Sequence, residues 1–156
     1  MSREDRAVRS GEFKLVREAL SLTVAAMAAL LSVSEGTVKN WEKGKYSPPP
    51  GVAAEIERLE AYTRRCVDAV VAAAQGREAP MVVVWRLTAD MPPGPARTLG
   101  AAWWRSVAAS ARERIPGLDV GYPDELDEVT GSRDRTLSEA IGPSVLPPTH
   151  SKYETR

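Results

Sequence analysis

Apolar residues fall at helical spacing through most of the first half of the chain. The pattern runs from Glu12 to Trp41 and resumes at residues 52–75, which indicates amphipathic helices. Thr23 and Ser34 stand where new helices would begin, because a hydroxyl there can accept a hydrogen bond from a first-turn backbone N–H. Gly44 stands where a helix would end. The pattern predicts short helices, two of them at 23–31 and 34–43, and one long helix at 52–75.

The spacing changes after Gly76. Residues 81–87 are short, β-branched and almost continuously apolar, which is typical of a strand. Residues 96–115 return to helical spacing, and residues 118–122 alternate between large apolar residues and aspartate or glycine, as a second strand would. We therefore predict a small strand-helix-strand unit at 80–123.

The two ends of the chain are polar. Residues 1–10 predict a flexible N-terminus, and residues 124–156 hold 7 acidic and 4 basic residues with few large apolar ones, which is typical of a flexible tail. An alternative for part of this tail is one short capped helix at 136–142. The expected fold is mainly α: a bundle of about five helices at 11–75, the small α+β unit at 80–123, and the flexible acidic tail.

Composition limits the chemistry that this chain can perform. Cys66 is the only cysteine and His150 the only histidine, so neither an internal disulfide nor a four-ligand Cys/His zinc site can form. A serine or cysteine nucleophile would depend on His150 in the polar tail. We expect no enzyme activity, no cofactor and no metal. Cys66 lies on an apolar helix face, where a buried inert thiol is favoured over a reactive one.

Charge and hydropathy limit the partners. The chain has 21 Lys and Arg against 21 Asp and Glu, so no overall field attracts nucleic acid, and any such site must be a local patch. No apolar run approaches the roughly 18 residues that span a bilayer, and the charged first residues do not form a signal-peptide core. We expect a cytoplasmic protein without membrane contact.

Several features of residues 13–48 agree in order and spacing. They are Arg17 in the first helix, Thr23 opening the second, Met27 and Ala28 inside it, Val33 and Ser34 at the turn, Val38 in the third, and residues 41–45 closing it. In these features the segment resembles the Xre family of helix-turn-helix regulators, the class of lambda repressor and Cro. The resemblance implies that the helix at 34–43 lies in the major groove of DNA, and that Arg17 and Glu42 form a structural ion pair between the first and third helices.

Position on the third helix assigns the expected DNA contacts. The expected base-reading residues are Glu35, Gly36, Thr37, Lys39 and Asn40, and the expected phosphate contacts are Thr23, Ser34, Lys43, Lys45 and Tyr46. Residues 1–50 contain 8 basic and 6 acidic residues, a net charge of +2. We therefore expect modest non-specific affinity and reliance on two domains bound together.

The segment departs from the family pattern at two positions. Val24 replaces a glutamine that usually contacts a phosphate, and Ser32 replaces the glycine of the turn. Positive φ at a serine costs about 1 kcal/mol. An alternative interpretation is therefore a fold that has lost DNA binding and serves as a protein-interaction module.

The second half carries four residues that we expect at a dimer interface: Trp85, Trp103, Trp104 and Val107. Residues 84–87 and the Trp103–Trp104 pair, in this layout, resemble the small autoregulators that accompany anti-CRISPR genes. That resemblance implies a C-terminal homodimerisation unit and repression of the protein's own operon at an inverted repeat. Trp103 and Trp104 lie about 100° apart on a helix, so one can face the core and the other a partner. The alternative is that the tryptophans line a small-molecule pocket.

The interpretation that best combines these features is a homodimeric repressor that reads double-stranded DNA through the helix at 34–43. Two alternatives from other classes remain. An antitoxin would bind DNA and also a protein partner through its tail, and an adaptor would keep the fold without binding DNA.

Overall fold

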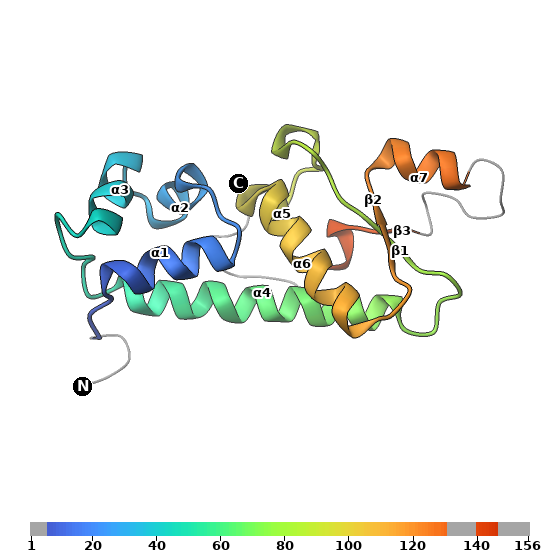
Figure 1. Ribbon diagram of the computed structural model, residues 1–156, viewed down its shortest axis with the longest axis horizontal. Helices are drawn as coiled ribbons and strands as arrows, with labels where there is room; N and C mark the ends of the chain where they lie inside the picture. Colours follow the sequence, from blue (N-terminus) through green and yellow to red (C-terminus); the bar gives the residue numbers. More distant parts are fainter. Residues whose placement is uncertain (1–5, 131–139, 147–156) are drawn as a thin grey trace. The chain divides into compact units, whose positions relative to one another are not determined.

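The computed structural model describes residues 6–130 and 140–146. The rest of the predicted N-terminus and tail, and residues 136–139 of the possible short helix, lie outside the described residues. The chain divides into two compact units, residues 1–63 and 64–156. The boundary falls inside the long helix α4 (Val52–Ala74) (Figure 1). This helix therefore contributes to both units.

Unit 1 consists of α1 (Ser10–Ala19), α2 (Val24–Leu31), α3 (Glu35–Lys43) and the first part of α4. Helix α3 packs against both α1 and α2. The rings of Phe13 and Trp41 meet edge to face, with centroids 5.5 Å apart and planes at 85°, an arrangement that aromatic pairs favour. The core is formed by Phe13, Val16, Met27, Ala28, Leu30, Val38, Trp41, Val52, Ile56, Leu59 and Tyr62.

The helix ends of unit 1 are where the sequence places them. Thr23 accepts a hydrogen bond from the Ala26 N–H at 3.0 Å, and Ser34 accepts one from the Thr37 N–H at 3.0 Å. These bonds satisfy donors that a helix leaves unpaired at its N-terminus. Gly44 ends α3 in the left-handed region at φ 79°. The two predicted short helices are confirmed.

Unit 2 joins the second part of α4 to a small parallel sheet. It contains β1 (Met81–Val83), the 3-10 helix η2 (Thr88–Asp90), α5 (Pro95–Leu99), α6 (Ala101–Arg114), β2 (Asp119–Gly121), α7 (Pro123–Thr130), β3 (Ala140–Ile141) and the 3-10 helix η4 (Pro143–Val145). The strand order is β2-β1-β3, and Met81 pairs with Asp119 on one side and Ala140 on the other. The mainly helical architecture with a small α+β unit agrees with the predicted fold class.

Two predicted elements of unit 2 are shorter than their patterns indicate. The strand predicted at 81–87 ends at Val83. Beyond it only the Val84 N–H still bonds to β2, at the Gly121 carbonyl, because β2 then gives way to α7. The helix predicted at 96–115 is broken at Gly100, whose φ of 105° and ψ of 165° lie outside helical geometry. Helix α6 restarts at Ala101, whose N–H donates to the Thr88 hydroxyl at 3.0 Å.

The predicted flexible tail is wrong for residues 124–130 and 140–146. Residues 123–130 form α7, in which the Glu125 carboxylate accepts the Tyr122 N–H at 2.9 Å and caps the helix. Residues 140–141 form β3, not the end of a short helix, and Ile141 is 1% exposed. The missed signals are Leu126 and Ile141, two large apolar residues within an acidic segment, both buried in the structure.

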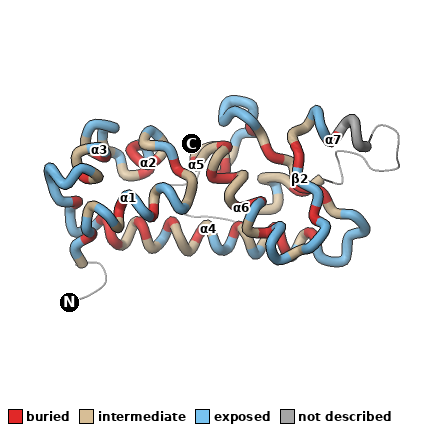
Figure 2. Tube along the Cα trace, viewed as in Figure 1, coloured by how far each residue is buried: buried red, intermediate tan, exposed pale blue. Residues whose placement is uncertain are grey.

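The predicted dimer interface is wrong for three of its four residues. Trp103, Trp104 and Val107 are each 0% exposed within a single chain, so none of them is available to a partner. Trp104 donates its indole N–H to the Val83 carbonyl at 2.7 Å and so joins α6 to β1. Figure 2 shows buried positions recurring along α6. Adjacent residues on a helix can both be buried when neighbours cover a wide arc of its surface. Trp85 is half-buried.

The loop after β1 is held by arginines. Arg105 donates to the carbonyls of Trp85 and Arg86. Arg86 lies over the Tyr122 ring at 4.0 Å and forms a bidentate pair with Asp124, at 2.7 and 3.2 Å. The hydrogen bond from Arg86 lowers the pKa of Asp124. Both side chains of this pair are more than half exposed, so the pair positions the loop more than it stabilises the unit.

Candidate nucleic-acid interface

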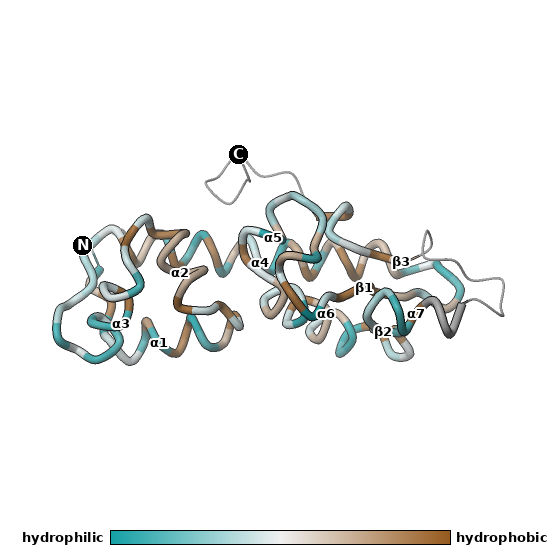
Figure 3. The backbone as a smooth tube through the Cα atoms, turned by 90° about the horizontal axis from the view of Figure 1, so that it is seen from above, coloured by the Kyte–Doolittle hydropathy of each residue, from teal (hydrophilic) through white to brown (hydrophobic). Residues whose placement is uncertain are grey.

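Helix α3 has one buried face and one open face. Val38 and Trp41 are buried on the inner face. Glu35, Gly36, Lys39 and Lys43 are exposed, whereas Thr37 and Asn40 are half-buried at the margin. Figure 3 shows the contrast between α2, which is hydrophobic along its length, and α3, which is largely hydrophilic. The structure therefore brings the five predicted base-reading residues together on the open side of one helix.

The N-terminal turn of α3 combines two roles. Ser34 accepts the Thr37 N–H, and the two hydroxyls lie 2.9 Å apart, so the predicted phosphate contact Ser34 also caps the helix. Gly36 follows in the exposed first turn, where an added Cβ would meet only the Ser34 hydroxyl, at 3.7 Å. Glycine is therefore not required there for packing, and it leaves the helix backbone open to a ligand.

The exposed cations gather on α3 and the segment that follows it. Lys39, Lys43 and Lys45 form no ion pair within the described residues. The Lys45 ammonium lies 5.5 Å from the centre of the Tyr46 ring, and Tyr46 is 58% exposed. Against these three cations stands one carboxylate, Glu35, in the first turn. The local charge is therefore positive although the whole chain is neutral.

Two ion pairs on or beside α1 neutralise other charges of unit 1. Arg6 and Glu12 form an ion pair at 2.8 Å, and Lys14 lies 4.0 Å from Glu18. The hydrogen bond from Arg6 lowers the pKa of Glu12. Such pairs cancel in the field that a distant phosphate experiences. The lysines of α3 and its C-terminal segment are left as the local positive patch.

Arg17 and Glu42 hold α3 to the rest of the unit. The guanidinium donates to the carboxylate with distances of 2.8, 3.1 and 3.2 Å, and its remaining nitrogen donates to the Leu22 carbonyl at 2.9 Å. The two side chains are only 15% and 8% exposed. A bidentate pair of this kind fixes geometry. It links α1, the loop before α2 and the C-terminal half of α3.

The turn between α2 and α3 adopts the backbone that glycine would favour. Ser32 has φ 58° and ψ 42°, in the left-handed region, which confirms the strained conformation predicted for it. The Val33 N–H then donates to the Ala28 carbonyl at 3.0 Å, and Ala28 is 3% exposed. Val24 begins α2 half-buried, without a side-chain group that could donate to a phosphate.

The described residues contain neither a metal-binding cluster nor a membrane-spanning helix. No group of three or more His, Cys, Asp or Glu side chains is arranged to hold a metal ion among residues 6–130 and 140–146. None of the helices described here combines the length and the apolar character that crossing a membrane demands.

Thr23, a predicted phosphate contact, is exposed beside the start of α2, and its hydroxyl caps that helix.

Comparison with known proteins identifies the N-terminal segment. Residues 13–59 match the family model described as Helix-turn-helix, which spans α1 from Phe13, then α2 and α3, and the beginning of α4. No curated protein matches the chain. The match coincides with the capped helices, the left-handed turn at Ser32 and the Arg17–Glu42 pair. Residues 13–59 of this protein are therefore a helix-turn-helix segment, similar to the Xre, or lambda-repressor-like, DNA-binding domains of transcription regulators.

Proposed function

We propose that this protein is a transcriptional repressor that binds, as a homodimer, an inverted-repeat operator in double-stranded DNA. The observation that supports the proposal is the open face of α3, where Lys39 and Lys43 form no ion pair in the described part of the chain and Asn40 lies at the margin. This face lies on the element that helix-turn-helix domains insert into the major groove.

Each residue of this face has a distinct role in the proposal. Asn40 makes a bidentate contact to adenine, Lys39 donates to guanine, and Glu35 accepts from cytosine. Thr37 offers its methyl group to thymine, and the backbone at Gly36 allows close approach. Lys43, Lys45 and Tyr46, with Thr23 and Ser34, contact phosphates and fix the register of the helix.

The modest charge of the domain argues for two copies on one operator. Residues 1–50 carry a net charge of +2, which gives weak non-specific attraction to DNA at physiological salt. Two linked domains place their reading helices about 34 Å apart, one turn of DNA, on two half-sites of opposite direction. Repression follows when the occupied operator overlaps a promoter, which we propose includes the promoter of the protein's own operon.

The experiment that tests this proposal is selection of bound sequences from random duplex DNA, performed at two salt concentrations. We expect an enriched inverted repeat whose affinity falls steeply with salt. The matched variants are Asn40→Ala on α3 and Lys14→Ala on α1, and only the first should change the selected sequence. An asymmetric single site would exclude the symmetric dimer, and no enrichment at either salt concentration would replace the repressor with a protein-binding adaptor.

A further inference from the structure

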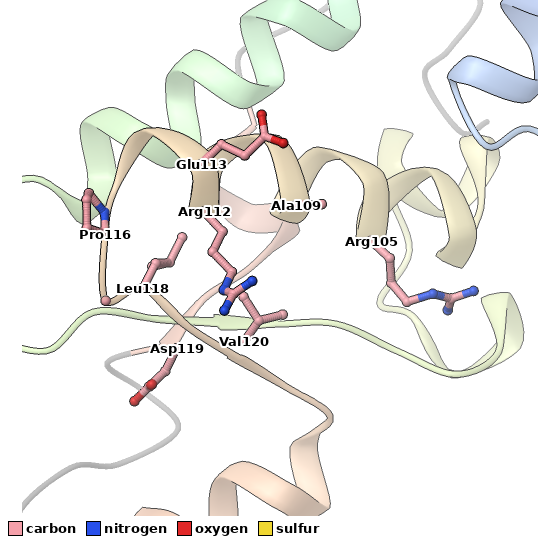
Figure 4. A pocket seen from close by; sticks show the side chains of 9 residues that line it. Arg105, Ala109, Arg112, Glu113, Pro116, Leu118, Asp119 and Val120 are labelled. Atoms are coloured by element: carbon pink, nitrogen blue, oxygen red, sulfur yellow. The ribbon is translucent and has the colours of Figure 1, made fainter.

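An open groove of unit 2 lies between α6 and β2. Its volume is about 730 Å³, and its lining includes Arg105, Ala109, Arg112 and Glu113 from α6 and Asp119 and Val120 from β2. Figure 4 shows the Arg112 side chain reaching from α6 toward Val120. Val120 was predicted to be part of a strand that alternates apolar residues with polar ones, yet its side chain is 40% exposed. An apolar strand residue is therefore open at the groove.

The backbone of β2 is also open on this side. In the described residues β2 pairs only with β1. The Asp119 N–H donates to the Pro80 carbonyl at 3.1 Å, and the Gly121 carbonyl accepts the Val84 N–H at 3.0 Å. Because successive residues of a strand direct their backbone groups to opposite sides, the N–H and C=O of Val120 point away from β1. Unpaired groups of this kind are a template for another strand.

The charges of the groove indicate which strand it takes. The lining holds two arginines, Arg105 and Arg112, and two carboxylates, Glu113 and Asp119. A lining without net charge favours neither an acidic nor a basic partner, and a surface with equal numbers of both signs can be complementary to itself. Self-complementarity is the property that a twofold interface requires.

We infer that the β2 edge and this groove bind a second copy of the chain, with the two β2 strands antiparallel about a twofold axis at Val120. This inference rests on the proposed function, since it names the surface of the dimer proposed there. Val120 and the partner's Val120 then exchange both N–H to C=O hydrogen bonds, as directly opposed residues do. The two sheets become one, the exposed edge is removed, and the small Ala109 leaves room beside the axis for the α6 helices.

Cysteine cross-linking without DNA tests the position of the axis. Val120→Cys is made in a Cys66→Ala background, so that the introduced thiol is the only one. Opposed Cα atoms in a hydrogen-bonded antiparallel pair are about 5.5 Å apart, within the range of a disulfide. We expect a disulfide-linked dimer on oxidation. The matched control is Ser144→Cys, an exposed residue just after β3, at the other edge of the sheet. Equal cross-linking of both variants, or of Ser144→Cys alone, would overturn the inference.

A second measurement compares Val120→Pro with Val120→Thr by sedimentation. Proline removes only the outward N–H, because the hydrogen bonds of β2 to β1 are made by its neighbours, and edge strands accept proline. We expect the dissociation constant of the dimer to rise about tenfold to a hundredfold for proline, since each copy loses one hydrogen bond. Threonine keeps the N–H and the β-branched shape, so it should leave the dimer unchanged.

The outcomes separate this inference from the proposed function. A dimer that resists Val120→Pro and does not cross-link through residue 120 uses another surface, which contradicts the inference and leaves the repressor intact. A monomeric wild-type protein that selects an asymmetric site contradicts both. Thermal unfolding of Val120→Pro distinguishes a lost interface from a lost fold, and if the variant is unfolded the cross-linking result decides alone.

Discussion

Each unit of this protein holds one of its helices in place by a different kind of interaction: α3 in unit 1 and α6 in unit 2. In unit 1 a bidentate ion pair, Arg17 with Glu42, ties α3 to α1, and the side chains are 15% and 8% exposed. In unit 2 two adjacent tryptophans, both 0% exposed, seat α6 against the unit, with one indole N–H donating to Val83. The first device supplies direction and little apolar area. The second supplies apolar area, together with the hydrogen bond from Trp104 to Val83.

This difference decides what a substitution does in each unit. An ion pair fails when either partner is removed, because the remaining charge stays buried and unpaired. Truncating a buried tryptophan lowers the free energy of unfolding in proportion to the volume removed, because the surrounding structure collapses only partly into the cavity.

Trp104→Ala should have the largest effect on stability. Removing a fully buried large aromatic side chain costs about 3 to 5 kcal/mol, and the Val83 carbonyl also loses its donor. Trp104→Phe keeps most of the volume and loses the hydrogen bond, so it should cost about 1 to 2 kcal/mol. Urea unfolding measures both values. If Trp104→Ala kept full stability but dissociated a dimer, Trp104 would be an interface residue and its burial in a single chain would be misleading.

Glu42→Ala should cost about 3 kcal/mol, because it leaves the Arg17 guanidinium largely buried without its carboxylate. The matched control is Asp124→Ala, which breaks the equally bidentate but exposed pair with Arg86 and should change stability very little. The double variant Arg17→Met with Glu42→Leu should recover most of the loss, since an apolar pair of similar volume can replace a buried ion pair. Similar losses for Glu42→Ala and Asp124→Ala in urea unfolding would contradict the contrast.

The same contrast explains how far the sequence predicted the fold. The helix ends of unit 1 depend on local interactions. The hydroxyls of Thr23 and Ser34 each accept a hydrogen bond from the backbone N–H three residues further along, and Gly44 ends α3 by adopting a positive φ. Each depends on one residue type in one position, so these helix ends were predictable, whereas the left-handed turn at Ser32 was expected only from the family resemblance. The ion pair spans 25 residues and came instead from the family resemblance.

Unit 2 depends on long-range packing, which a single sequence does not specify. Periodicity predicted a helix through Gly100, because a break at one glycine hardly changes the apolar spacing on either side. Strand β3 is two residues long, and its pairing with β1 crosses about 60 residues of chain. The two tryptophans indicated a buried helix, but not which neighbouring elements cover each ring. In the candidate site, the shared face of α3 was predictable from spacing, whereas the base contacts remain predictions.

Binding variants sharpen the contrast on the DNA side of unit 1. Asn40→Ala should cost about 1 to 3 kcal/mol and relax the preference at one base pair. Lys43→Ala should weaken all sequences alike and lower the slope of log affinity against log salt by about one. The measurement is binding to the selected operator and to a scrambled duplex over a series of salt concentrations. The same sequence-independent loss for both variants would contradict the division between base-reading and phosphate-binding residues.

The smallest expected effect concerns the two left-handed residues that end α2 and α3. Ser32 and Gly44 have φ of 58° and 79°, a region that costs a residue with a Cβ about 1 kcal/mol. Ser32→Gly should therefore raise the free energy of unfolding by up to about 1 kcal/mol, and Gly44→Ala should lower it by about as much.

The added Cβ at residue 44 would meet only the Ser10 hydroxyl, at 3.6 Å, so the loss reports backbone strain and not a clash. Urea unfolding of the two variants beside Gly36→Ala, a helical glycine where an added Cβ would make only an ordinary contact with the Ser34 hydroxyl, isolates the strain. If Ser32→Gly lowered stability, the Ser32 side chain would have to contribute more than its strained backbone costs, and the helix-turn-helix would depend on a polar contact at the turn as it does at Arg17.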